Sequence, residues 1–343
     1  LFFVEHKKPS GVWIMAYTDI DKPSDYFNTK LYTGNGGAQT ITGVNFEPNL
    51  IWIKQRNGTG NHVVTDTVRT VDYQLHTNTT DADSSLTNNV TSTNSDGFVV
   101  NTDGEVNGSS DTYVAWNWKE QAGVMDIVTY TGNGSNRTIA HNLGVKPAVM
   151  IHKGRSNTYN WGVYHHALSP SNERSLNFNT TGAVNVDDGG VYYNSTDPTS
   201  SVFSLGTNVG YNANSATYVA YLFAEKQGYS KFGSYTGNGD VDGSTIWCGF
   251  SPAFIMIKCT DLARVWRMWD NKRDVNNPNT ANFQAQASNA EYDDPSVSID
   301  FLSSGFKVRS TDSSYNGSGN SYVYMAFAEN PFVTSTGVPA TAR

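Results

Sequence analysis

Acidic residues are the first candidates for catalysis in this 343-residue chain. The catalytic groups of a glycosidase are two carboxylates about 5 to 9.5 Å apart. The loop-like stretches contain several, including Asp187, Asp188, Glu291, Asp293 and Asp294. No pair recurs at a fixed place, so we interpret them as solvated loop carboxylates. The sequence also contains no phosphate-binding glycine loop, nucleophile elbow or Cys/His metal framework. We therefore predict that the protein is not an enzyme.

Two short segments could be expected to hold a cation. His165 and His166 are adjacent, and neighbours on a strand point to opposite faces, so we interpret them as surface or core residues rather than as ligands of one ion. Asp240 and Asp242 lie in an oxygen-rich segment that lacks the spaced third acid and the bidentate glutamate of an EF-hand. We expect no cofactor, and for this segment a weak structural calcium site and a hydrogen-bonded turn both stay open.

Aromatic residues give the clearest indication of binding. Phe, Trp and Tyr make up 13% of the chain, which is more than the cores of small domains require. An exposed ring can stack on the apolar face of a sugar while Asn and Asp side chains bond its hydroxyls. The same rings would serve equally well in packing between subunits. Six tyrosines in loop-like sequence are candidates for glycan or partner binding: Tyr159, Tyr192, Tyr193, Tyr211, Tyr292 and Tyr315.

A repeated phrase shows which elements must position these residues. The sequence Tyr-Thr-Gly-Asn-Gly occupies residues 32–36, 130–134 and 235–239, at steps of 98 and 105 residues. Three landmarks in constant order indicate three homologous modules. Units of about 100 residues have the size of independent domains, so we expect each module to have its own core. The other two landmarks are the apolar segments 46–54, 145–153 and 250–258 and the closing segments 112–118, 217–223 and 321–327.

The module boundaries follow from these landmarks. Because the first residue is Leu1 rather than Met, we expect the lead-in to continue from a longer chain, or the chain to have been processed. The predicted division is a lead-in of residues 1–29, module one at 30–123, module two at 124–228, module three at 229–335 and a tail at 336–343.

Within a module the pattern predicts only β-structure. Aromatic and β-branched residues are frequent, turn residues recur about every ten positions, and no helical period is sustained. The segment Leu50 to Lys54 is too apolar to alternate, which predicts a strand buried on both faces, whereas Tyr113, Ala115 and Asn117 should face away from Val114, Trp116 and Trp118. We therefore predict an all-β protein of three tandem antiparallel β-sandwiches of the jelly-roll or lectin-like kind. The Asn-Gly pairs that suit turns with positive φ are residues 35–36, 57–58, 133–134 and 238–239.

The modules differ in two respects. Modules one and three contain Asp66/Arg69 and Asp270/Arg273, where module two has His165-His166-Ala167. We interpret each acid–arginine pair as an ion pair that orients a turn. Three long polar stretches also diverge, and we expect binding residues to concentrate in them. These stretches are residues 70–94, 168–199 and 275–295.

Composition excludes several classes of partner. The net charge of −8 argues against nucleic acid and against anionic membranes, both of which attract clustered Lys and Arg. No segment approaches 18 consecutive apolar residues, so we expect no membrane insertion. Cys248 and Cys259 flank one strand and have no counterparts in the other modules, which indicates two buried thiols rather than a disulfide.

The landmarks together resemble a repeated β-rich domain of structural proteins from tailed bacteriophages, notably marine phages and cyanophages. The resemblance rests on the Tyr-Thr-Gly-Asn-Gly phrase, the strand ending in Trp52-Ile53-Lys54, the downstream Asp-x-x-Arg and the closing Thr-Tyr-Val-Ala-Trp-Asn-Trp-Lys, and it covers roughly residues 20 to 335. It implies a location on the virion surface, and it implies no catalytic residues. Module two departs from the Asp-x-x-Arg pattern.

Two functions of different classes follow. The favoured one is a tail-fibre adhesin, a homo-oligomer and by preference a homotrimer, whose variable loops contact a host cell-surface polysaccharide. The alternative is a structural virion component, such as a capsid decoration or tail adaptor, whose loops bind other virion proteins. A depolymerase that cleaves the same glycan is a third, weaker hypothesis.

Overall fold

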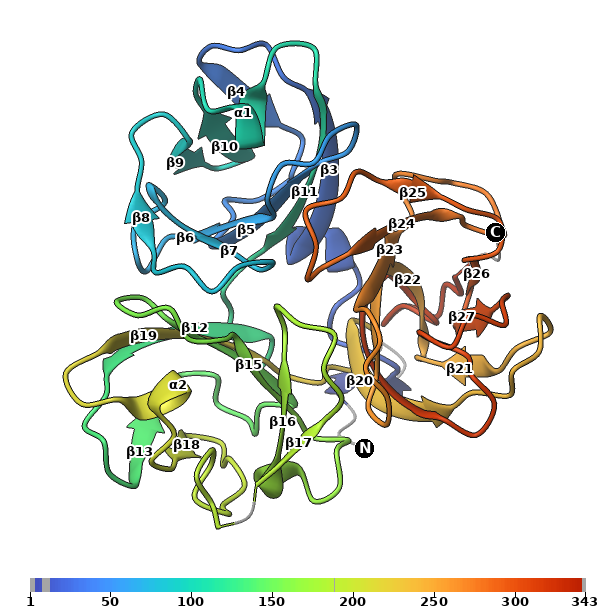
Figure 1. The fold of residues 1–343 in the computed structure, drawn as a ribbon. Coiled ribbons are helices and arrows are strands. Elements are labelled where there is room, and N and C mark those ends of the chain that lie inside the picture. The colour runs from blue at the N-terminus through green and yellow to red at the C-terminus, as the bar shows by residue number, and fades with distance from the viewer. Residues whose placement is uncertain (1–3, 8–12, 188, 341–343) are drawn as a thin grey trace.

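The computed structural model describes residues 4–7, 13–187 and 189–340 and consists almost wholly of antiparallel β-strands (Figure 1). Three modules lie around a common centre in chain order. Each is a sandwich whose six-stranded inner sheet faces the centre and whose smaller outer sheet has two or three strands. The predicted all-β architecture of three tandem sandwich modules is confirmed.

A short lead-in precedes the modules. Strand β1 (Val4–Lys7) pairs with β2 (Trp13–Ala16), and the 3-10 helix η1 (Pro23–Asp25) follows. Pro23 stands at the start of η1, where its missing N–H has no helical partner to lose. The chain then enters module one at Phe27.

In module one the inner sheet has the order β3-β11-β5-β6-β7-β8 and the outer sheet the order β4-β10-β9. The elements are β3 (Phe27–Thr33), β4 (Gln39–Thr42), β5 (Leu50–Gln55), β6 (Val63–Asp66), β7 (Tyr73–His76), β8 (Ser84–Ser85), β9 (Val90–Asn94), β10 (Gly97–Val100), α1 (Gly104–Asn107) and β11 (Thr112–Trp118).

Module two repeats this order as β12-β19-β14-β15-β16-β17, with the two-stranded outer sheet β13-β18. Its elements are β12 (Met125–Thr131), β13 (Arg137–Ala140), β14 (Val149–Gly154), β15 (Gly162–His165), η2 (Ser171–Glu173), β16 (Arg174–Asn177), β17 (Asn185–Val186), β18 (Val202–Leu205), α2 (Val209–Asn212) and β19 (Thr217–Phe223).

Module three has the inner order β20-β28-β22-β23-β24-β25 and the outer order β21-β27-β26. Its strands are β20 (Ser230–Thr236), β21 (Thr245–Trp247), β22 (Phe250–Cys259), β23 (Arg267–Asp270), β24 (Ala281–Gln284), β25 (Tyr292–Asp293), β26 (Ile299–Leu302), β27 (Gly305–Val308) and β28 (Ser321–Pro331).

Both faces of each inner sheet are buried, as the apolar segment of β5 predicts. Ile51 and Ile53 point into the core of their own module, whereas Leu50 and Trp52 point into a core that all three modules share. Strand β11 alternates as predicted, with Tyr113 facing the module core. Strand β5 is therefore apolar on both faces because the neighbouring modules bury its second face.

The sequence predicts a separate core in each module, and the structure adds a core that the three modules share. Each module has an interior of its own, and a further cluster joins all three. Its centre is formed by the last residues of the three closing phrases, Trp118, Phe223 and Phe327. Their ring centroids lie 5.6 to 6.2 Å apart in edge-on contacts. The modules therefore fold against one another.

The Tyr-Thr-Gly-Asn-Gly phrase fastens the first strand of each module to the turn before its closing strand. In module one Tyr32 stacks on Tyr113 at 5.1 Å and donates to the carbonyl of Val106. The buried Asn107 accepts from the backbone N–H of Asn35. The same contacts recur in the other two copies, so the phrase is structural. The equivalent stacked pairs are Tyr130–Tyr218 and Tyr235–Tyr322, and the equivalent buried amides are Asn212 and Asn316.

Three of the four Asn-Gly pairs form the predicted turns with positive φ at glycine. Gly36, Gly134 and Gly239 have φ of +71°, +71° and +70°, in the region that favours glycine. Gly58 does not have a positive φ, so that prediction is wrong. A side chain at Gly58 would collide with the amide of Gln55, so this glycine provides room rather than a turn.

Both cysteines are free and buried, which confirms the prediction of two thiols. Cys259 and Cys248 belong to the core of module three. Burial raises the pKa of the Cys248 thiol far above its ordinary value, so this thiol stays protonated and unreactive.

Replacing the first glycine of the repeated phrase tests its role as a fastener. A Cβ atom at Gly34 would lie 2.2 Å from the carbonyl oxygen of Gly108, whereas one at Gly104 would meet nothing within 4 Å. We expect Gly34→Ala to lower the free energy of unfolding by about 1–3 kcal/mol and Gly104→Ala to change it by less than about 0.5 kcal/mol. Urea unfolding of the two variants measures this, and equal effects would contradict the close packing.

Candidate functional site

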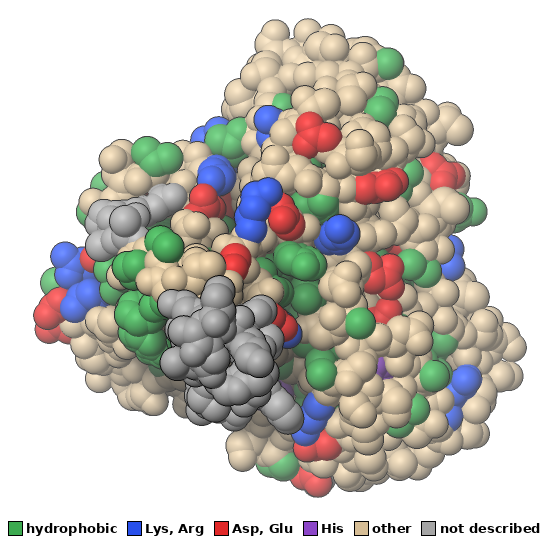
Figure 2. All heavy atoms as spheres, turned by 180° about the vertical axis from the view of Figure 1, so that it is seen from behind, with side chains coloured by type: hydrophobic (Ala, Val, Ile, Leu, Met, Phe, Trp, Pro, Cys, Tyr) green, Lys and Arg blue, Asp and Glu red, His purple; other side chains and the backbone are tan. Residues whose placement is uncertain are grey.

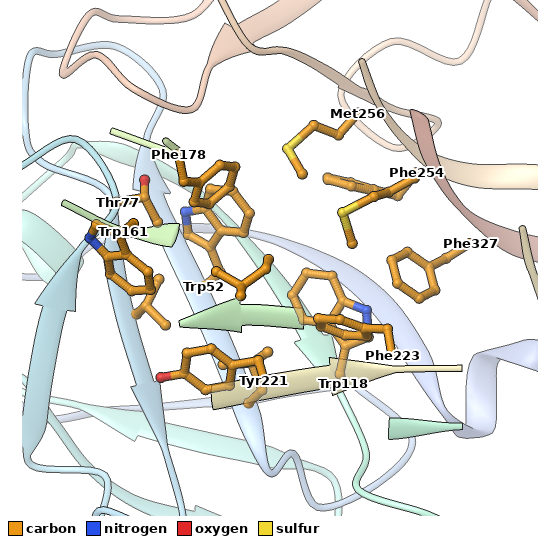
Figure 3. A pocket seen from close by; sticks show the side chains of 14 residues that line it. Trp52, Thr77, Trp118, Trp161, Phe178, Tyr221, Phe223, Phe254, Met256 and Phe327 are labelled. Carbon is orange, nitrogen blue, oxygen red and sulfur yellow. The ribbon is translucent and has the colours of Figure 1, made fainter. Parts of the chain in front are cut away.

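A small cavity lies where the inner sheets meet, with Trp52, Trp118 and Trp161 among the side chains that point towards it (Figure 3). Its volume is about 30 Å³, and apolar side chains of all three modules form its walls. Thr77 at its edge already donates to the carbonyl of Ala285 at 2.6 Å. The space is comparable to that of one water molecule. We therefore interpret this cavity as a packing gap, and a binding surface must be sought elsewhere.

Three buried lysines at equivalent positions lie between the modules. Two of them donate hydrogen bonds to a neighbouring module, whereas the ammonium of Lys54 lies 5.3 Å from the ring centroid of Phe283 in module three. Lys54, Lys153 and Lys258 end the apolar landmark of each module and are fully buried. Lys153 donates to the carbonyl of Thr80 in module one at 3.0 Å, and Lys258 donates to that of Thr181 in module two at 3.2 Å. Burial lowers the pKa of each lysine to about 8. The sequence does show a lysine at the end of each apolar segment, but the sequence pattern alone does not indicate that these lysines are buried between modules.

The variable loops form a closed ring of hydrogen bonds between modules. In each junction a backbone N–H in the variable stretch of one module donates to a carbonyl that follows the buried lysine of the next module. Module one thus reaches module two, module two reaches module three, and module three returns to module one. The bonds are Asp83 to Arg155 at 2.9 Å, Val184 to Thr260 at 2.9 Å and Glu291 to Arg56 at 2.8 Å.

The junction of modules one and two is a buried charge network. Arg155 of module two bonds Asp83 at 2.6 Å, and Asp83 also lies 3.6 Å from Arg69. Arg69 bonds Asp66 at 2.6 Å, and both side chains are fully buried. Tyr221 of module two donates to Asp66 at 2.8 Å and completes the network. The predicted Asp66/Arg69 ion pair is confirmed, and it also connects two modules.

The junction of modules three and one is built in the same way. Arg56 of module one bonds Glu291 at 2.8 Å, and Glu291 lies 3.1 Å from Arg273. Arg273 bonds Asp270 at 2.5 Å, and the indole N–H of Trp116 in module one donates to Asp270 at 3.0 Å. The order arginine, acid, arginine, aspartate and aromatic donor is the same as in the first junction.

The junction of modules two and three replaces every member of this network. Thr260 and Val184 stand in the places of the outer arginine and its acid. His165 and Leu168 stand in those of the aspartate and inner arginine, and Met325 replaces the aromatic donor. His165 instead lies 3.1 Å from a backbone carbonyl of module three. Because a buried charge without its partner is costly, the charged residues are present or absent together. This explains why module two lacks the acid–arginine pair.

The six candidate tyrosines fall into two groups. Tyr193, Tyr211 and Tyr315 are buried in module cores, so the prediction that they are exposed loop rings is wrong. Tyr211 lies on α2, which points its ring between the two sheets, where it contacts Tyr193 at 5.6 Å. Turn residues in this fold thus supply core side chains.

The remaining three candidates are partly or largely exposed. Tyr159 is 43% exposed. Tyr192 is half-buried against the ring of Tyr211, and Tyr292 lies beneath the guanidinium of Arg267 at 5.7 Å. Tyr159 and Tyr192 belong to module two and Tyr292 to module three. Their role in binding stays a prediction.

The segment with Asp240 and Asp242 does not fit a calcium ion. Asp242 lies 2.7 Å from Lys307 and 3.3 Å from Arg309, so its carboxylate already faces two cations. Hydrogen bonding to Lys307 lowers the pKa of Asp242. Asp240 accepts from the backbone N–H of Asp242 at 2.9 Å, which is the hydrogen-bonded turn of the second interpretation.

The adjacent histidines are packing residues rather than a metal pair. Nε2 of His165 lies 3.1 Å from the carbonyl of Tyr324, and Nε2 of His166 lies 2.7 Å from that of Phe232. Both carbonyls belong to module three. Burial lowers the pKa of His165 to about 3, so it is neutral at pH 7. Within residues 4–7, 13–187 and 189–340, no group of three His, Cys, Asp or Glu side chains is placed to hold a metal ion.

A carboxyl pair that the search of the loops missed lies near the start of module two. Burial and hydrogen bonding to Asp126 raise the pKa of Glu120 to about 7. Asp126 is buried and accepts from the backbone N–H of Asn142 at 2.6 Å. A glycosidase holds its two carboxyls about 5 to 9.5 Å apart on either side of the scissile bond, whereas Glu120 and Asp126 are close enough to perturb each other by hydrogen bonding. The pair therefore lacks the geometry for that reaction.

Fold and junctions together define the class: an all-β protein of three sandwich modules closed into a ring by buried junctions. Among the described residues, no helix combines the length and the apolar character needed to cross a bilayer. The chain belongs to the family described as Domain of unknown function (DUF7483), whose sequence profile matches residues 22–331. The match covers all three modules. No curated protein matches the chain.

Removing the acid at the centre of one charged junction tests its contribution to stability. Glu291→Ala removes the carboxylate that Arg56 and Arg273 share. Because Arg273 keeps Asp270 and Arg56 is partly exposed, we expect the free energy of unfolding to fall by about 1.5–3 kcal/mol. Val184→Ala changes the equivalent residue at the junction of modules two and three, and it should lower the free energy of unfolding by about 1 kcal/mol. Urea unfolding at pH 7 measures both, and similar losses would show that the charges add nothing specific.

The buried lysines predict an unusual pH dependence. Their native pKa of about 8 lies below the ordinary value of 10.5, so between these values the unfolded chain binds more protons and the free energy of unfolding rises with pH. Above about pH 10 the buried tyrosines oppose this rise, because their native pKa values are raised and the unfolded chain loses protons first.

Lys258→Met removes one of the three contributions. From pH 8 to 9.5 we expect the stability of the variant to rise less steeply than that of the wild type, in urea titrations at half-unit steps. Lys146→Met, at an exposed lysine, is the matched control, and its curve should run parallel to the wild type. A parallel curve for Lys258→Met would contradict the role assigned to its buried ammonium.

Proposed function

We propose that this protein is a non-enzymatic structural component of a bacteriophage virion, the distal part of a tail fibre that contacts host-surface polysaccharide. The observation that supports this proposal is the location of the residues that repeat in all three modules. The stacked tyrosine pairs and the buried asparagines fasten strands within each module, and the buried lysines and the shared aromatic core lie between modules. The framework thus uses all three landmarks internally. What differs between the modules at the surface is left for recognition.

The character of the surface supports this proposal. Figure 2 shows one face on which uncharged side chains and backbone dominate, with acidic and basic groups in small, mixed clusters. A neutral glycan offers hydroxyls rather than charge, and such a surface can bond hydroxyls without favouring ions. Weak binding at one site would suffice on a fibre, because several copies raise the effective concentration.

A structural role inside the virion is the second candidate, and one observation favours it. Parts of all three variable stretches, at Asp83, Val184 and Glu291, are used in junctions between modules rather than at a free surface. Loops of this kind would equally suit a capsid decoration or a tail adaptor. The homotrimer also stays a prediction, and light scattering of the purified protein measures it.

Labelling virions distinguishes the two candidates. We expect an antibody against this protein to mark fibre tips in electron micrographs, and purified protein to adhere to host cells without releasing reducing ends from their polysaccharide. Label spread over the capsid would contradict the adhesin and support the decoration. Release of reducing ends would show a depolymerase instead.

A further inference from the structure

One large aromatic side chain stands out on the outer sheet of module three. Trp247 is 58% exposed, more than any other aromatic side chain in the described part of the chain. It lies on β21, where its neighbour Ile246 points into the module core and Trp247 therefore points outward. Its ring packs against Phe332 in an edge-to-face contact, with the two ring centroids 5.0 Å apart and the ring planes at 65°.

The repeat supplies an internal control for this residue. Strand pairing places Thr42 and Ala140 at the equivalent positions of modules one and two, each next to a buried isoleucine. Both modules build the same sandwich without an indole there. The exposed ring is therefore not needed by the framework, and burial cannot account for it.

The surface beside the indole is flat. Trp247 pairs with Gly305 on β27, and Gly305 pairs in turn with Leu302 on β26. A Cβ atom at Gly305 would lie 1.9 Å from the carbonyl oxygen of Ile246, so this position has no side chain beside the ring. The indole, the glycine and the leucine thus form one continuous apolar row across three strands.

A polar row runs parallel to the apolar one, and its charges cancel. Register places Thr245, Lys307 and Asp300 side by side on the same face. Lys307 pairs with Asp242 at 2.7 Å, and Arg309 pairs with Asp300 at 3.1 Å. Two cations and two anions leave no net charge, so this face has no preference for an ionic ligand.

We propose that this face of module three, centred on Trp247, is a binding site for a neutral carbohydrate. The C–H face of a hexose stacks on the indole and extends over Gly305, while its hydroxyls bond the hydroxyl of Thr245, the carboxylate of Asp300 and the ammonium of Lys307. A phosphate, a nucleic acid or an acidic polymer would gain nothing from the paired charges. The inference rests on the proposed function, because it names the site through which the adhesin would hold its glycan.

The test is a calorimetric titration of the full chain with three neutral glucose hexamers: laminarihexaose, maltohexaose and cellohexaose. We expect at least one to bind, and Trp247→Ala to weaken that binding about tenfold or more, as loss of a central aromatic anchor does. Trp247→Tyr should restore most of the affinity, because a phenol ring also stacks. Thr42→Ala, at the exposed equivalent position of module one, is the matched control and should bind like the wild type.

Three results would overturn the site. They are no binding of any hexamer by the wild type at about 10 mM, the same affinity in Trp247→Ala, and a dimer of the wild type that Trp247→Ala dissociates in sedimentation. The last would show that a second copy covers the indole. Because the side chain is exposed, the thermal midpoint of Trp247→Ala should match the wild type and confirm that the variant is folded.

The two proposals fail separately. If no hexamer binds while the antibody still marks fibre tips, the inference about Trp247 is wrong and the tail-fibre role stands. If a hexamer binds through Trp247 while the label covers the capsid, the carbohydrate site stands and the tail-fibre role is wrong.

Discussion

Burial of the second face of each inner sheet is the constraint on which the structure depends. A sandwich covers one face of its large sheet and leaves the other exposed, and in these modules the other face carries Trp52, Trp116 and their equivalents. Such a face cannot remain in water at that size. Three modules placed around one axis cover each other, with Trp118, Phe223 and Phe327 meeting at the centre. Closure into a ring is thus the solution for three sheets that are apolar on both sides.

The polar chemistry of the junctions follows from this closure. When the ring closes, the parts of the variable stretches that lie at the junctions are buried, and any charged side chains on them are buried as well. The two charged junctions pair their buried groups in series, from Arg155 to Tyr221 and from Arg56 to Trp116. In the first series the contact of Arg69 with Asp83, at 3.6 Å, is an ion pair without a hydrogen bond. The third junction lacks the arginine–acid series, and Val184 and Leu168 pack there instead. One chain therefore contains both solutions to the same burial problem.

The repeat also separates framework from function. A residue present in all three modules at one position is explained by what every module needs, as the buried lysines and the stacked tyrosine pairs are. A residue present once requires a different reason. Half-buried or buried tyrosines of the variable stretches have a packing reason, whereas the exposed indole of module three has only its contact with Phe332. Under the proposed function, exceptions to the repeat are therefore better guides to the binding site than loop sequence.

The sequence alone determined the all-β class, the three modules and the local features of strands and turns, including the doubly buried strand at Leu50 and the ion pairs at Asp66 and Asp270. These depend on residues close in the chain, whose periodicity and spacing are visible directly. It could not place Tyr193, Tyr211 and Tyr315 inside, because a turn residue points inward or outward according to the sheets around it. It also could not show that Asp83 meets Arg155 or that Glu291 meets Arg56. Those contacts join segments about 70 and 235 residues apart, and only the closure of three sheets around one axis brings them together, since no local pattern encodes which loop will lie beside which.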